Sequence, residues 1–218
     1  MFTGIVQATG RIVAVDDHGA GRRVRVEASS LGLHDVRIGD SIAVNGACMT
    51  VTEVDTGTFS FDISAESLSK TAGLDRPGEV NLERAMRFGD RIDGHLASGH
   101  VDATGTVVRF EQRAESWTLV VESPPALARY LAYKGSISVD GVSLTINHVE
   151  DVDVDGVRTG CRFWVNLIPH TLAVTTLKAL RPGDPVNLEV DLIARYVARM
   201  LESRSTTARR PRQQRVAK

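Results

Sequence analysis

The chain has 218 residues, of which 42% are apolar and 24% are charged, as is usual for a globular protein. No apolar run reaches the ~18 residues that a membrane span requires, and the N-terminus lacks the basic start and long apolar core of a signal peptide. The formal net charge is −1, but residues 204–218 hold six Arg or Lys and no acid, which leaves −7 for the rest. This basic end is short, polar and without aromatic residues, so we expect a disordered, solvated tail and neither a nucleic-acid nor a membrane partner.

The chain has two cysteines, Cys48 and Cys161, which do not occupy matching positions in the repeats described next. Two unmatched cysteines make no disulfide framework. We therefore expect a cytoplasmic protein, because the cytoplasm keeps thiols reduced.

The sequence contains an internal duplication. FTGIVQATGRIV at 2–13 returns as ASGHVDATGTVV at 97–108, and SIAVNGACMTVTEV at 41–54 returns as SISVDGVSLTINHV at 136–149, both after 95 residues. A third pair, FDISAESL at 61–68 and VNLIPHTL at 165–172, is offset by 104, and we attribute the difference of 9 to a longer acidic loop around 151–160. A constant offset over separated blocks indicates a duplicated domain.

Each repeat reads as roughly six short strands separated by turns. The Asn45-Gly46 and Asp140-Gly141 dipeptides are hairpin signals, because both residues tolerate positive φ. The pattern predicts an all-β protein with a few short helices, built as two tandem six-stranded antiparallel Greek-key barrels. We expect barrels over 1–96 and 97–190, a helix over 191–203 and the basic tail over 204–218, with helical turns at 29–33, 66–71, 124–132 and 170–177.

The expected C-terminal helix has no counterpart in the first repeat. Its sequence, DLIARYVARMLES, places Leu192, Ile193, Tyr196, Val197, Met200 and Leu201 on one stripe. Such a helix either caps its own barrel or packs against other subunits, and the pattern alone does not choose between them.

Four motifs identify a family. The MFTGIV opening, the NGxCxTV turn, the GHLxSGHVD junction and the DGxSLT turn resemble riboflavin synthase, and the likeness covers residues 1–200. The resemblance implies a dismutation in which two molecules of 6,7-dimethyl-8-ribityllumazine exchange a four-carbon unit. The products are riboflavin and 5-amino-6-ribitylaminouracil, and neither a metal nor a redox cofactor is used. It also implies a homotrimer, with each active site between the N-terminal barrel of one subunit and the C-terminal barrel of its neighbour.

The resemblance carries the family's site onto residues of both repeats. The positions implied for catalysis are Phe2, Cys48, His100, Asp140 and Ser143. Those implied for substrate binding are Gly4, Ile5, Val6, Cys48, Met49, Thr50, Asp62, Ile63, Ser64, Ala65, Glu66, Ser67, Gly99, His100, Val101, Lys134, Ser143, Leu144, Thr145, Asn166, Leu167, Ile168, Pro169, His170 and Thr171.

Duplication suits this chemistry, because two copies of one substrate need two similar pockets with different reactive groups. The repeat alignment sets Ile5 opposite His100, Gly39 opposite Lys134, Asn45 opposite Asp140, Cys48 opposite Ser143, Asp62 opposite Asn166 and Glu66 opposite His170. The hydroxyl, amide and carboxylate side chains in both sets are of the types that bind a polyol.

Several roles stay open. Because proton transfer near neutral pH is most often carried by histidine, His100 is a candidate acceptor for the acidic 7-methyl proton of the lumazine, or it is a structural residue at a barrel mouth. Cys48 is a nucleophile, a binding residue or an inert buried thiol. The HLASGH spacing of His95 and His100 lacks a third ligand, so we expect no metal site. Phe2 is implied to fold over the catalytic pocket, so Phe2→Ala is expected to lower activity far more than stability.

Two rival functions remain. Lumazine proteins, which are non-catalytic relatives, use the same barrels to hold one ligand, but complete motifs in both repeats and an intact Cys48 favour the enzyme. A flavin-dependent reductase barrel would need an attached nucleotide-binding domain with a Gly-rich strand–turn–helix unit, which the sequence lacks.

Overall fold

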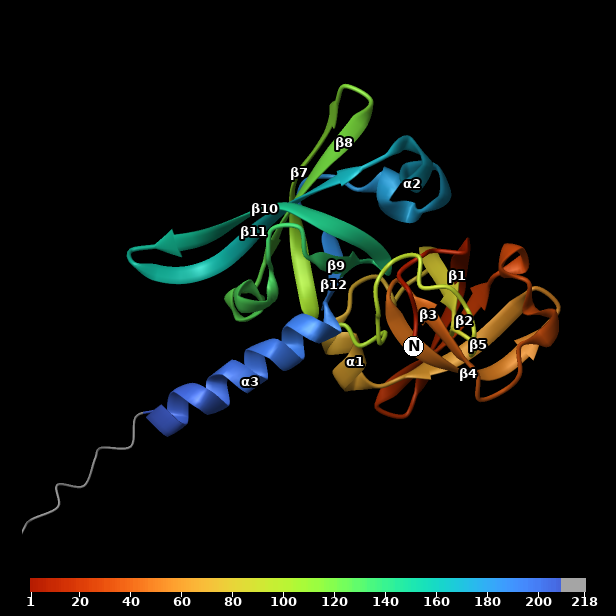
Figure 1. Cartoon of the computed structure of the whole chain (residues 1–218). Coiled ribbons are helices and arrows are strands. Elements are labelled where there is room, and N and C mark those ends of the chain that lie inside the picture. The colour runs from red at the N-terminus through yellow and green to blue at the C-terminus, as the bar shows by residue number, and fades with distance from the viewer. Residues whose placement is uncertain (209–218) are drawn as a thin grey trace, which may run out of the picture.

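The computed structural model describes residues 1–208 and consists mainly of two closed six-stranded barrels (Figure 1). The first contains β1 (Ala8–His18), β2 (Gly21–Glu27), β3 (Ser41–Val44), β4 (Ala47–Asp55), β5 (Thr58–Ile63) and β6 (Gly78–Arg84). The second contains β7 (Ala103–Arg113), β8 (Ser116–Ser123), β9 (Ser136–Val139), β10 (Val142–Val154), β11 (Val157–Leu167) and β12 (Pro185–Val190). The predicted all-β, two-barrel fold is confirmed.

The two barrels have the same topology. The strand order β1-β2-β5-β4-β3-β6 recurs as β7-β8-β11-β10-β9-β12, and all neighbours are antiparallel. Even the bulges repeat, since β1 shifts register between Ile12 and Ala14 and β7 between Val107 and Arg109. Alternating apolar residues fill each barrel, around Phe59 and Phe61 in the first and Phe163 in the second.

The two Gly-centred turns lie back to back between the barrels. Asn45 and Asp140 both have φ of 46°, as the hairpin signals predicted. A Cβ on Gly46 would lie 2.7 Å from the Gly141 nitrogen, so only glycine allows this approach. The barrels are thus joined tip to tip about a local pseudo-twofold axis.

The segments that open each repeat cross to the other barrel. Phe2 and Ala97 pair their backbones at the crossing, with N–O distances of 2.8 and 3.0 Å. Beyond it, Val6 packs on the core of the second barrel and Val101 on that of the first. Each barrel is therefore completed by a segment of the other repeat. The expected domain boundary at residue 96 does not include this exchange of segments.

Short helices fill the expected positions. They are η1 (Ser29–Leu31), η2 (Leu33–Asp35), α1 (Ala65–Lys70), η3 (Pro125–Tyr130), α2 (Pro169–Val174) and η4 (Thr176–Ala179). The C-terminal helix, α3 (Leu192–Ala208), runs five residues past the expected end at 203, because the first helix-breaking residue is Pro211. Of the basic tail, residues 209–218 lie outside the described part. No helix within residues 1–208 has the length and apolar character to cross a bilayer.

The expected acidic loop at 151–160 is not a loop. β10 and β11 continue pairing as far as Val154 and Val157 and close at Asp155-Gly156, both with positive φ. The prediction failed because acidic residues were taken as a loop signal, whereas the intervening residues are β-branched and suit a ribbon.

Candidate active site

A cavity of about 220 Å³ opens beside Cys48 on the first barrel. Its walls come from β4, from α1 and from the crossing segment before β7. The lining residues are Ala47, Cys48, Met49, Glu66, Ser67, Lys70, Thr71, Gly99, His100 and Val101. Two of the predicted reactive side chains, Cys48 and His100, therefore meet in one cavity, which we call the first pocket, although they come from different repeats.

Backbone contacts fix the crossing segment in the first pocket. The Cys48 amide donates to the Gly99 carbonyl at 2.7 Å. A Cβ on Gly99, where φ is 79°, would lie 2.6 Å from the Cys48 Cβ, so this close approach needs glycine. The exposed His100 follows directly after Gly99, which contacts the half-buried Cys48.

Helix α1 forms the opposite wall of the first pocket. Ser64 caps it by accepting from the Ser67 amide at 3.1 Å, and Ala65 begins it. Glu66 and Lys70 are one helical turn apart and both line the cavity.

The pseudo-twofold axis repeats this arrangement on the second barrel, where we call it the second cluster. The Ser143 amide donates to the Gly4 carbonyl at 2.7 Å. A Cβ on Gly4 would lie 2.7 Å from the Ser143 Cβ, and Ile5, 44% exposed, takes the place of His100. Ile168 is the N-cap of α2, and Pro169, His170 and Thr171 lie within that helix.

Two buried carboxylates hold the crossing segments. Glu83 accepts from the Thr3 amide and hydroxyl, both at 2.7 Å, and from the Gly4 amide at 3.0 Å. Glu189 makes the same three bonds to Ser98 and Gly99. Burial raises the pKa of Glu83 above its usual range, which these hydrogen bonds partly oppose.

His95 joins the second cluster, although the sequence analysis considered it only as a metal ligand. Its Nδ1 lies 2.7 Å from Ser143 Oγ, and its buried Nε2 has no hydrogen-bond partner among the described residues. Burial lowers the pKa of the imidazole, against the opposing charges of Asp191 and Glu189. The GHLxSGHVD junction, which contains His95, was the available sequence signal.

Asp140 lies in the tip-to-tip contact between the barrels. Its Oδ1 accepts from the Asn187 amide at 2.7 Å, as Asn45 Oδ1 accepts from Asn81 at 2.8 Å. Asn81 Nδ2 then donates to the Asp140 carbonyl, and Asn187 Nδ2 to the Asn45 carbonyl. Burial raises the pKa of Asp140 to about 7. The carboxyl therefore fixes the turn within the second barrel, whereas the Asp140 backbone carbonyl accepts the bond from the first barrel. Ser143 follows three residues later, on β10.

Other predicted site residues have different surroundings. Asp62 forms a two-pronged ion pair with Arg23 at 2.8 and 3.0 Å, which lowers its pKa. Lys134 is exposed in a left-handed conformation, with φ of 63°, and donates to Asn147. Buried in the barrels are Ile63, Leu144 and Leu167, whereas Thr50, Thr145 and Asn166 are exposed.

Phe2 is buried rather than folded over an opening. It is 1% exposed and packs with Ala43 and Ala97, next to Cys48. This placement supports a role in shaping the first pocket, but it means that truncation also removes packing. The expectation that Phe2→Ala spares stability is therefore revised.

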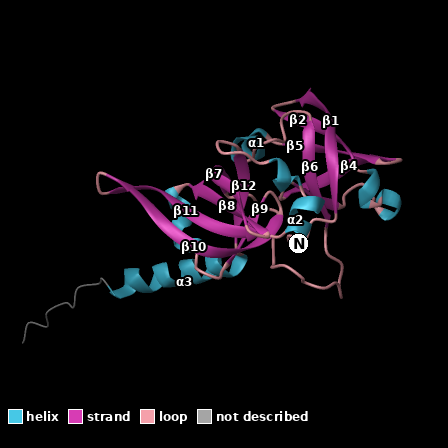
Figure 2. Cartoon of the chain, turned by 90° about the horizontal axis from the view of Figure 1, so that it is seen from above, coloured by secondary structure: helices cyan, strands magenta, loops and turns pink. Residues whose placement is uncertain are grey.

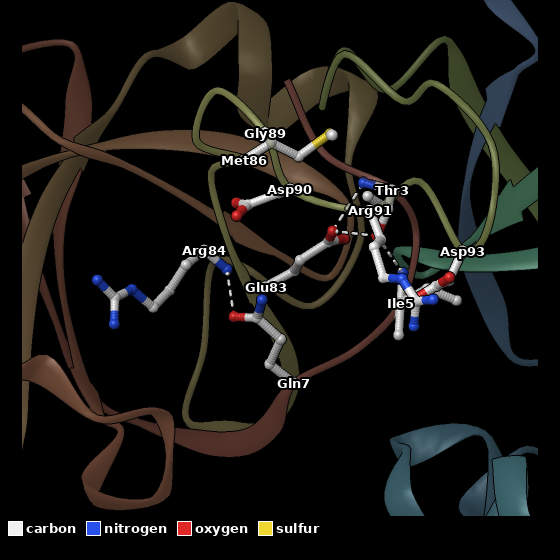
Figure 3. A pocket seen from close by; sticks show the side chains of 10 residues that line it. All are labelled: Thr3, Ile5, Gln7, Glu83, Arg84, Met86, Gly89, Asp90, Arg91 and Asp93. Carbon is white, nitrogen blue, oxygen red and sulfur yellow. Dashed lines mark hydrogen bonds between the residues drawn. The ribbon is translucent and has the colours of Figure 1, made fainter.

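A larger cavity, of about 470 Å³, lies elsewhere on the first barrel (Figure 3). It lies between the opening segment and the linker after β6, and its lining residues are Thr3, Ile5, Gln7, Glu83, Arg84, Met86, Gly89, Asp90, Arg91 and Asp93. In Figure 3 the Glu83 carboxylate points to Thr3 and the Gln7 amide to the Arg84 backbone. Glu83, Thr3 and Gln7 are engaged in these structural bonds, so size alone does not make it the reactive site. Within residues 1–208 no group of three metal-ligating side chains is found.

Comparison with known proteins agrees with this geometry. The model of the lumazine binding domain matches residues 3–85 and 98–191, one match for each repeat. Riboflavin synthase of Mycobacterium tuberculosis (strain ATCC 25618 / H37Rv) is 44% identical over 213 residues, which cover 93% of this chain and 99% of the relative. The chain belongs to the riboflavin synthase family.

Further riboflavin synthase relatives include that of Photobacterium phosphoreum, which is 42% identical over 92% of this chain and 89% of its own. Among solved structures, LumP complexed with 6,7-dimethyl-8-(1'-D-ribityl) lumazine superposes with a TM-score of 0.73 at 25% identity, covering 87% of this chain and 99% of that one. The identity to riboflavin synthases is well above that to LumP. The chain is accordingly an enzyme that transfers a four-carbon unit. The alternative of a non-catalytic lumazine-binding protein is not favoured.

Proposed function

We propose that the first pocket and the second cluster each bind one molecule of 6,7-dimethyl-8-ribityllumazine and that the four-carbon transfer takes place between them. The observation that carries this proposal is the pseudo-twofold repetition of one site with different reactive groups. Cys48 and His100 stand on one side, and Ser143 and Ile5 on the other. One substrate molecule donates the four-carbon unit and the other accepts it. The two sites must therefore be alike in the shape that binds the substrate and different in their reactive groups.

In the first pocket, His100 accepts the 7-methyl proton and Cys48 contacts the reacting ring. Their shared cavity supports these roles. In the second cluster, the Ser143 hydroxyl faces the other ring and His95 orients it through the 2.7 Å contact. Hydroxyl groups on β4, β10, α1 and α2 hold the ribityl chains; they are Thr50, Ser64, Ser67, Thr145 and Thr171.

The reaction balances without a cofactor, because the carbons that one lumazine loses are those that the other gains. The two products together contain every atom of the two substrates. Most of the acceleration then comes from holding the two rings in contact, since orientation of bound reactants contributes on the order of 7–11 kcal/mol.

The two sites of one reaction come from different copies of the chain, in a homotrimer. Two observations support this. The first pocket, at about 220 Å³, is smaller than the ~300–1,000 Å³ typical of ligand sites, so another surface is needed to close it. The exposed apolar residues of α3, such as Tyr196 at 64%, offer a surface for association. We place this enzyme in the cytoplasm, where its two free cysteines stay reduced.

Mixing of two inactive variants tests the site between copies. His100→Ala disables the first pocket and Ser143→Trp fills the second cluster. If each site joins two copies, unfolding and refolding the variants together should restore about one quarter of the wild-type activity, because one random pairing in four combines two intact halves. Each variant refolded alone is the control. No gain over the separate variants would show that both halves come from one chain.

A further inference from the structure

The last strands of the two barrels carry the same buried polar pair. β6 contains Asn81 and Glu83 in the sequence VNLE, and β12 contains Asn187 and Glu189 in the same sequence. All four residues are between 1% and 4% exposed. Residues two apart in a strand share a face, so both members of each pair point away from the apolar core of their own barrel. Buried polar side chains are hydrogen-bonded, and the partners of these four show what they hold.

Asn187 of the second barrel holds the helical wall of the first pocket. Its Oδ1 accepts from the Ala72 amide at 2.7 Å, and its Nδ2 donates to the Asn45 carbonyl at 3.0 Å and to the Ala72 carbonyl at 3.3 Å. Ala72 follows Thr71, which is the C-cap of α1 and lines the first pocket. The place where α1 ends is therefore fixed by a side chain of the other barrel.

Glu189, on the same strand, holds the opposite wall. Its carboxylate accepts from the Ser98 amide at 2.7 Å and from the Gly99 amide at 3.0 Å. The Gly99 carbonyl accepts in turn from Cys48, and His100 comes next in the chain. Two walls of the first pocket, α1 and the crossing segment, are thus both held by β12 of the second barrel.

β6 of the first barrel holds the second cluster in the same way. Asn81 Oδ1 accepts from the Thr176 amide at 2.8 Å, where α2 passes into η4. Glu83 accepts from the Gly4 amide at 3.0 Å, and the Gly4 carbonyl accepts from Ser143. Both views show α1 and α2 in the region where the two barrels meet (Figures 1 and 2). The support is therefore crossed, because each last strand holds two walls of the site on the other barrel.

We propose that Asn187 and Glu189 are positioning residues of the first pocket, and that Asn81 and Glu83 are positioning residues of the second cluster. Each barrel then sets the affinity for substrate of the site on the other barrel. The ligand is taken from the proposed function, on which this inference rests, whereas the crossed support is also tested without a ligand.

The first test measures amide hydrogen exchange in the ligand-free protein. Asn187→Ala and Asn81→Ala remove side chains of nearly equal burial at matching positions, so each is the matched control for the other. The Leu68 amide in α1 and the Leu172 amide in α2 are matching probes, bonded to the carbonyls four residues before them. Asn187→Ala should speed exchange at Leu68 about 10-fold and leave Leu172 unchanged, and Asn81→Ala should do the reverse.

A second pair of variants keeps the size of the side chains. In Glu189→Gln and Glu83→Gln an NH₂ group replaces one accepting oxygen, so one backbone amide loses its acceptor. The probes are the Cys48 and Ser143 amides, which bond to the two crossing segments. Glu189→Gln should speed exchange at Cys48 alone, and Glu83→Gln should speed exchange at Ser143 alone.

The second test measures affinity at one site at a time. Ser143→Trp fills the second cluster and leaves the first pocket, whereas Cys48→Trp fills the first pocket and leaves the second cluster. Neither background turns substrate over, so calorimetric titration with 6,7-dimethyl-8-ribityllumazine reports binding alone. The two β12 variants should weaken binding about 10-fold in the Ser143→Trp background, as the loss of one hydrogen bond implies, and about 2-fold or less in the other. The two β6 variants should show the opposite preference.

The crossed pattern is what separates positioning from stability. Equal losses at both sites would show that the four residues serve the fold alone and would overturn the inference. A loss at the site of the variant's own barrel, or unchanged affinity in all four variants, would overturn it as well. Crossed exchange in a protein that binds no lumazine in either background would uphold the crossed positioning and sink the proposed function.

Discussion

Asp140→Asn should make the protein more stable at neutral and higher pH and leave it unchanged near pH 4. In the folded state burial raises the pKa of Asp140 from 3.8 to about 7. Between these two values the native state keeps a proton that the unfolded chain has released. Stability therefore falls as the pH rises through this window, and it stays low above pH 7. Asparagine remains neutral and still offers an oxygen to the Asn187 amide, as Asn45 does to Asn81.

The size of the effect follows from the same shift. A change of one pKa unit corresponds to about 1.36 kcal/mol. The shift from 3.8 to about 7 therefore limits the difference in unfolding free energy between the two proteins to about 4 kcal/mol at pH 8. We expect Asp140→Asn to raise the free energy of unfolding by about 1–3 kcal/mol at pH 8. The value is below the limit because a buried site that relaxes or admits water lowers the cost of burying an ionised carboxylate.

Urea unfolding of both proteins at pH 5, 6, 7 and 8 measures this difference. The raised pKa of Glu83 and the lowered pKa of His95 also affect the pH profile, but they occur in both proteins and cancel in the comparison. Asn45→Asp is the mirror control, since it places a second acid at the pseudo-equivalent position and should lose stability as the pH rises. Parallel pH profiles for the wild type and Asp140→Asn would refute the reasoning.

Three further changes test the site. Phe2→Ala should lower the unfolding free energy by about 3–5 kcal/mol and also lower activity, because it empties a buried position beside Cys48; unchanged thermal unfolding would contradict this. His95→Ala should lower kcat about 10-fold with little change in KM, because it removes the side chain that orients Ser143, and His95→Gln should restore part of the activity, because glutamine can still reach the hydroxyl; a change in KM alone would argue for binding only. Cys48→Ser should lower kcat by about 10²-fold or less and not abolish it, because most of the rate comes from orienting two substrates; complete loss would point to an obligatory thiol adduct.

The barrels could be predicted because their signals are local. Each strand carries its own alternation, and the turns at Asn45-Gly46 and Asp140-Gly141 need glycine whatever surrounds them. The duplication then supplied the matching topology. The acidic ribbon was missed because composition favours a loop where β-branched residues and a tight turn favour pairing.

The crossing of the opening segments could not be read from the sequence. Gly4 against Ser143 and Gly99 against Cys48 are contacts between repeats, and no pattern within one repeat encodes which barrel a segment joins. The same holds for His95, whose importance depends on the distant Ser143. Site residues were therefore predicted by type and motif, and only the fold shows which of them meet.

The measurement that bears most directly on this account is the conversion of 6,7-dimethyl-8-ribityllumazine by the purified, untagged chain with nothing else added. We expect flavin absorbance to replace lumazine absorbance, with one riboflavin formed for every two lumazines consumed and with chelator having no effect. Tight binding of the lumazine without any riboflavin would contradict the account and leave the chain as a carrier built on the same two barrels.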